Sequence, residues 1–164
     1  MRLIIAVFVL SAVAWPAWSG DFAAAQTKSD QYRVEQKALE EAKQKNDAEA
    51  AKTHAKSVVA LLEEARALYE QSGIAKANDI APLRSYAALL TDAGDFDLAA
   101  EVLRRATGLE PKNAEIWTAL GENLSQSGPK FKDESIRALK HAIELNPEPP
   151  VAAKAHFLLG QGSW

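Results

Sequence analysis

The feature that most constrains the fold is a pattern of apolar residues that returns after 34 to 36 positions. Two positions recur after 34 residues: Ala65 matches Ala99, and Tyr69 matches Leu103. Three recur after 36 residues: Leu103 matches Leu139, Ala106 matches Ala142, and Pro111 matches Pro147. Steps of three and four residues put such positions on one face of a helix. The interval therefore predicts a repeated helical unit.

The second half of the chain reads as a series of helices with clear breaks. Gly94, Pro111, Gly128 and Pro147 separate the apolar stretches, and no segment alternates as a strand does. The predicted fold class is therefore all-α. We expect helices at about these ranges: 80–92, 95–108, 114–127, 133–146 and 151–161.

The residues at the recurring positions resemble the tetratricopeptide repeat family. That family's pattern has a first helix with large apolar residues and a small residue after Leu, a Gly-Asp turn, alanines on the second helix and a closing proline. The matching residues are Trp117, Leu120, Gly121, Leu124, Gly94, Asp95, Phe96, Ala99, Ala106, Leu109 and Pro111. Leu83 and Tyr86 depart from the expected aromatic and Leu, and Ser135 replaces an alanine.

The resemblance implies an α-solenoid of stacked helix hairpins. It predicts one repeat over 80–113, a second over 114–149, and a C-terminal half-repeat or capping helix over 150–164. Large side chains of each first helix would fill the space left by alanines on the second. Trp117 is expected in the core.

A long helical segment precedes the repeats. Residues 28–72 contain no Gly or Pro and favour a helix. Residues 54–79 carry a regular apolar stripe and are expected to pack. Residues 26–53 are polar, so we expect a helical or partly disordered extension that frays or projects as a stalk. Self-association of this polar helix as a coiled coil remains an alternative. A coiled coil needs apolar residues at a seven-residue spacing, and here that spacing reaches the polar residues Asn46 and Thr53.

The first residues have the pattern of a secretory signal. Arg2 precedes an apolar run over 3–14, and small-residue sites follow at 17–19 and 23–25. We therefore expect residues 1–25 to be a signal peptide, cleaved near 19–25, and the protein to lie in the bacterial periplasm. The alternative is an N-terminal membrane anchor.

The composition offers little for catalysis. The chain has no cysteine, three histidines on separate helices, and no recognisable catalytic or phosphate-binding motif. Its net charge of −3 argues against nucleic acid as a partner. We expect a non-enzymatic protein with no cofactor and no metal.

The family resemblance implies a concave groove, lined by the first helices, that binds a peptide or a partner protein. The residues expected to face it are Arg84, Ala88, Thr91, Thr118, Glu122, Ser125, Lys154, Phe157 and Gln161. The predicted function is a protein–protein interaction scaffold of the cell envelope, with an oligomerising structural protein as the alternative.

Overall fold

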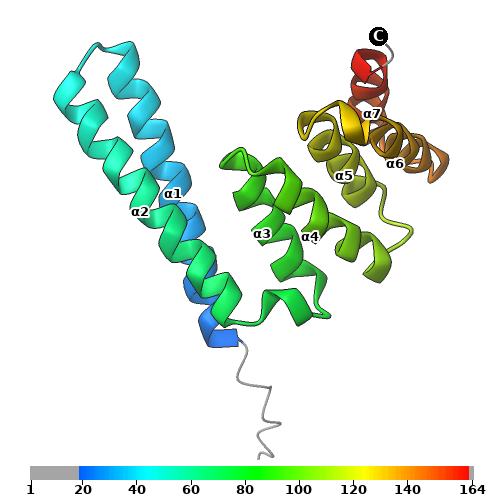
Figure 1. Cartoon of the computed structure of the whole chain (residues 1–164), viewed down its shortest axis with the longest axis horizontal. Coiled ribbons are helices and arrows are strands. Elements are labelled where there is room, and N and C mark those ends of the chain that lie inside the picture. Colours follow the sequence, from blue (N-terminus) through cyan, green and yellow to red (C-terminus); the bar gives the residue numbers. More distant parts are fainter. Residues whose placement is uncertain (1–18, 163–164) are drawn as a thin grey trace, which may run out of the picture.

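The computed structural model describes residues 19–162, which form seven α-helices and two short 3₁₀ turns without any strand. Residues 1–18 of the predicted signal segment lie outside this range. The helices are α1 (Ser19–Gln44), α2 (Ala48–Gln71), α3 (Ile80–Asp92), α4 (Phe96–Leu109), α5 (Ala114–Gln126), α6 (Lys132–Glu144) and α7 (Pro149–Gly162) (Figure 1). The 3₁₀ turns are η1 (Ile74–Lys76) and η2 (Pro129–Phe131). The all-α prediction is confirmed.

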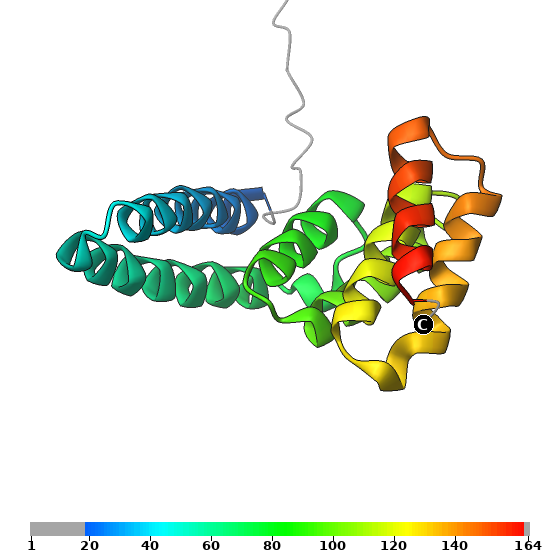
Figure 2. The ribbon, with the colours of Figure 1, turned by 90° about the horizontal axis from the view of Figure 1, so that it is seen from above.

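The helices pack in chain order as antiparallel hairpins. α1 lies on α2, α3 on α4, and α5 on α6, and α4 joins the second hairpin to the third. α7 packs on both α6 and α5, in the place of the first helix of a further unit. The two views agree that the hairpins follow one another along the long axis of the molecule (Figures 1 and 2). The predicted α-solenoid is thus confirmed.

Short side chains fix where the repeat helices begin. Asp79 accepts a hydrogen bond from the amide of Ala81 before α3, and Asn113 accepts from the amides of Glu115 and Ile116 before α5. These caps satisfy amides that have no partner inside the helix. The turn between α3 and α4 passes through Gly94 at φ 80°, a left-handed conformation that glycine adopts without a steric cost.

The positions that recur in the sequence form the core in each unit. Ala65, Ala99 and Ser135 are at most 4% exposed, although they lie on three different second helices. Their partners one turn later, Tyr69, Leu103 and Leu139, are also buried. The small position leaves room for a neighbouring helix and the large one fills the space beside it.

Gly121 lies at a close approach of α5 and α6. A Cβ atom on Gly121 would lie 2.5 Å from Cγ and 2.7 Å from Cδ2 of Leu139, and 3.3 Å from the carbonyl oxygen of Ser135. Only a glycine therefore fits without a shift of the Leu139 side chain or of α6. This agrees with the close approach expected for the small residue after Leu120.

Trp117 is half-buried rather than fully enclosed. It packs against the main core, its indole Nε1 donates to the carbonyl of Pro111 at 2.8 Å, and its ring meets His141 edge-on with centroids 4.6 Å apart. Trp117 thus joins α5 to α6 and to the loop before it.

The segment 28–72 is helical as predicted, but it is two helices instead of one. The chain reverses at residues 45–47, inside the predicted extension 26–53. Asn46 has φ 55°, and the Asp47 carboxylate accepts from the amide of Ala50 at 3.0 Å, which starts α2. Asn tolerates the left-handed conformation better than most residues, so the turn needs neither Gly nor Pro.

The first hairpin is anchored to the repeats at one end and projects at the other (Figures 1 and 2). At the anchored end, the ring of Tyr69 lies 4.7 Å from that of Tyr86 on α3 and 5.6 Å from that of Phe22 on α1. The hydroxyl of Tyr32 donates to the carbonyl of Asp92 at the end of α3. The polar residues 26–44 are thus held as a helix by α2.

Candidate functional site

A cavity of about 610 Å³ lies between α3 and α5. Both helices are the first of their hairpin, and one residue of α1 reaches the same cavity. The lining residues are Arg33, Ala81, Arg84, Ser85, Ala87, Ala88, Thr91, Asp92, Leu103, Glu115, Ile116, Ala119, Glu122 and Asn123. We call this cavity the α3–α5 groove.

Four of the residues expected to face a groove lie in this one. Arg84, Ala88 and Thr91 contribute the α3 side, and Glu122 contributes from α5. The hydroxyl of Thr91 forms a hydrogen bond of 2.9 Å with Oδ1 of Asn123, which ties the two walls together. Asn123 is only 1% exposed, and its amide also donates to the carbonyl of Ala119.

Thr118 does not line the groove. It is 3% exposed, and its hydroxyl donates to the carbonyl of Ala114 within its own helix. Thr118 stands one repeat after Arg84, but it is buried, and α5 packs on α6 and α7 as well as on α4. The face of α5 that meets the groove is instead formed by Glu115, Ala119 and Glu122.

The remaining expected residues lie towards α7. Ser125 and Gln161 line a second, smaller cavity of about 240 Å³, together with Leu158. Lys154 on α7 reaches back to Glu122, with 2.7 Å between Nζ and Oε2. Phe157 is 64% exposed. The nine expected residues are therefore divided between the α3–α5 groove, the α5–α7 side and one buried position.

One ion pair joins each first helix to the next. Arg33 of α1 lies 2.8 Å from Asp92 of α3, and Arg84 of α3 lies 2.7 Å from Glu115 of α5. The third pair is Lys154 of α7 with Glu122 of α5. Arg33, Asp92 and Glu115 were not expected from the sequence, because the pairing depends on helices that are distant in the chain.

Another ion pair joins two second helices away from the groove. The guanidinium of Arg104 on α4 binds both carboxylate oxygens of Glu134 on α6, at 2.6 and 2.9 Å. This hydrogen bonding lowers the pKa of Glu134 below its usual value and raises that of Arg104. The pair fastens the second hairpin to the third, so its charges are used within the structure.

The described side chains include no cluster of three or more metal-ligating residues. Two histidines make single contacts with carboxylates: His54 with Glu35 at 2.7 Å, and His141 with Glu144 at 3.6 Å. Among helices of the described part, none is long and apolar enough to cross a membrane.

Comparison with known proteins agrees with the geometry. Among curated proteins, none matches this chain. A family model does match: residues 80–123, which span α3, α4 and most of α5, fit the tetratricopeptide repeat. Proteins with such repeats generally mediate protein–protein interactions. The match covers both walls of the α3–α5 groove, so this part of the all-α solenoid is similar to a tetratricopeptide repeat.

Proposed function

We propose that this protein is a non-catalytic scaffold of the bacterial cell envelope that holds a peptide or a partner protein in the α3–α5 groove. The observation that carries the proposal is the cavity of about 610 Å³ between two consecutive first helices. Its volume lies within the range of roughly 300–1,000 Å³ that is usual for ligand sites. Arg84 and Glu122 supply charge, and Ala88 leaves space.

A photo-crosslinking amino acid at position 88 tests the groove. We expect a crosslinked partner in living cells from position 88 and none from position 67. Ala67 is the control because it is an exposed alanine on α2 that is outside the groove lining. Once the partner is identified and purified, Ala88→Trp should weaken binding by about tenfold or more, since the indole would occupy the cavity. Equal affinity of Ala88→Trp, Ala67→Trp and the unmodified protein would contradict the groove.

The location in the envelope is proposed from the N-terminal sequence. The apolar run over 3–14 and the small residues after it are typical of a secretory signal. Osmotic-shock fractionation should release a processed protein with the periplasmic contents. An unprocessed chain in the cytoplasmic fraction would contradict export, and one that stays with the membrane would favour the N-terminal anchor.

Self-association through the first hairpin is a second candidate. Val34 on α1 and Val59 on α2 are 68% and 57% exposed, which leaves apolar surface on the projecting hairpin. Against this candidate, α1 already packs along α2 within one chain. Sedimentation of the protein and of the Val34→Lys/Val59→Lys variant separates the two ideas. A dimer that the variant converts to a monomer would favour self-association, whereas a monomer in both cases would exclude it.

A further inference from the structure

We infer that the α3–α5 groove takes uncharged peptide segments with small or medium apolar side chains, in preference to acidic or basic ones. This inference rests on the proposed binding function and adds the chemistry of the partner. It is carried by the pairing of the charges around the groove and by the apolar surface between them.

Every charged residue that lines the groove has an ionic partner within the protein. The lining contains Arg33, Asp92, Arg84, Glu115 and Glu122. The first two pair with each other, the next two pair with each other, and Glu122 pairs with Lys154. The lining itself has two cations and three anions, and Lys154 of α7, at the edge of the groove, neutralises the third anion, so the three pairs together carry no net charge.

This pairing gives little attraction to a charged partner. A lysine of the partner that approached Glu115 would also meet Arg84, whose Nη2 is 2.7 Å from that carboxylate. The attraction of this lysine to Glu115 and its repulsion by Arg84 nearly cancel, and the lysine still loses part of its hydration on binding. A strongly acidic or basic segment therefore gains less here than an uncharged one.

The surface between the ion pairs carries short apolar side chains. Ala81, Ala88 and Ala119 are the accessible ones, and Ala87, Leu103 and Ile116 close the floor at no more than 3% exposure. Short side chains let the main chain of a partner approach the helices closely. The volume of about 610 Å³ suits a few residues of an extended segment with modest apolar side chains.

Hydrogen-bonding capacity remains for the partner's main chain. A guanidinium has five N–H groups, and Arg84 uses Nη2 towards Glu115, so further donors are available to peptide carbonyls. Arg84 is half exposed, which keeps these donors accessible. Main-chain recognition of this kind does not require a charged side chain on the partner.

Selection from a random library of twelve-residue peptides displayed on phage tests the inference. The library is panned on the purified protein, and the enriched peptides are synthesised. We expect enriched peptides with little or no net charge, whose Kd by fluorescence anisotropy changes by less than about twofold between 50 and 500 mM NaCl. Enrichment of strongly acidic or basic peptides, or a Kd that rises steeply with salt, would overturn the inference.

A charge reversal gives the sharper comparison. Arg84→Glu leaves two like charges where an ion pair stood, so the groove becomes anionic. For a version of the enriched peptide with two added lysines, we expect this variant to bind about tenfold more tightly at 50 mM than at 500 mM NaCl. The double variant Arg84→Glu/Glu115→Arg restores the pair and should recover the original preference.

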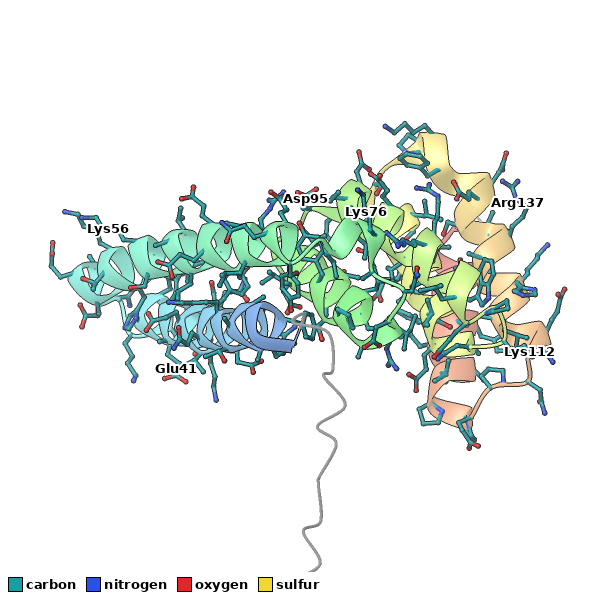
Figure 3. The ribbon with its side chains drawn as sticks, turned by 90° about the horizontal axis from the view of Figure 1, so that it is seen from below. Glu41, Lys56, Lys76, Asp95, Lys112 and Arg137 are labelled. Carbon is teal, nitrogen blue, oxygen red and sulfur yellow. The ribbon has the colours of Figure 1, made fainter. Side chains whose placement is uncertain are left out.

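Lys56→Glu is the matched control, because it makes the same change in net charge outside the groove. Lys56 is exposed and lies near the projecting end of the first hairpin (Figure 3). The Lys56→Glu variant should bind the lysine-bearing peptide as the unmodified protein does. An equal salt dependence of binding in Lys56→Glu and Arg84→Glu would overturn the inference. If no peptide is enriched, or if enriched peptides bind Ala88→Trp undiminished, the proposed groove function itself fails.

Discussion

The hydroxyl of Ser135 on α6 donates a hydrogen bond of 2.6 Å to the main-chain carbonyl of Gly121 on α5. Ser135 is 4% exposed, and it stands where the family pattern has an alanine. The glycine brings the two helices close enough for this bond to form. The departure from the pattern is therefore accommodated, because the extra polar atom has a partner.

Loss of this hydrogen bond should weaken the third hairpin. We expect Ser135→Ala to lower the free energy of unfolding by about 0.5–1.5 kcal/mol, the usual net contribution of one hydrogen bond. Urea denaturation followed by circular dichroism measures the change. Ser57→Ala on α2 is the control, since the Ser57 hydroxyl bonds only within its own helix, to Thr53 at 3.4 Å. An unchanged midpoint for Ser135→Ala would contradict this account.

A methyl group at Gly121 should force α5 and α6 apart. The added Cβ would meet Leu139 at 2.5 and 2.7 Å, so we expect Gly121→Ala to destabilise the protein by about 1–3 kcal/mol, as overpacking does. Gly108→Ala on α4 is the matched control, because nothing lies within 4 Å of a Cβ there. That variant should be more stable by about 0.5–1 kcal/mol, from helix propensity alone. The same direction of change in both thermal melts would be inconsistent with close packing at Gly121.

The first turns of α1 should contribute to stability. Phe22 packs against Tyr69, and Ala25 is fully buried. A chain that begins at Gln26, after the second predicted cleavage position, lacks both contacts. We expect it to be less stable by about 1–3 kcal/mol than a chain that begins at Gly20, after the first position.

Urea denaturation of the two chains measures this difference. A chain that begins at Gly20 and carries Phe22→Ala separates the ring contact from the length of α1. It should fall between the other two in stability. Equal stability of all three chains would mean that the N-terminal turns of α1 contribute nothing to the core.

The three tyrosines predict a loss of stability at alkaline pH. They are the only tyrosines in the chain, and all lie where the first hairpin packs against α3. The rings of Tyr69 and Tyr86 are in contact, and Tyr32 donates to the carbonyl of Asp92. Burial is the main cause that raises the pKa of Tyr32, Tyr69 and Tyr86 above 10. The folded protein thus keeps protons that the unfolded chain releases, so stability is complete below about pH 10 and falls as the pH rises further.

Absorbance of tyrosinate at 295 nm measures this effect directly, with urea denaturation at pH 8 and at pH 11 beside it. We expect ionisation to begin above pH 10 and to coincide with loss of helix. Tyr69→Phe should reduce the dependence of stability on pH in this range, because one titrating hydroxyl is removed. Tyrosines that ionise at pH 10 in a protein that keeps its helices would contradict their burial.

Much of the fold follows from the sequence alone. The five repeat helices begin and end within about two residues of the predicted positions, because glycine, proline and capping residues act locally. The small and large positions at the 34-residue interval also proved to be core. The reversal at residues 45–47 was missed, because Asn46 turns the chain without a glycine or a proline.

The groove was predicted less completely, and the reason is physical. Periodicity places Arg84, Thr118 and Glu122 on faces of their own helices, but it does not say which neighbouring helix covers each face. Arg84 faces the groove, whereas Thr118, one repeat later, is buried. The sequence by itself determined the helices and their repeat. Only the packing of helices far apart in the chain decided which side chains line the groove and which charges are already paired.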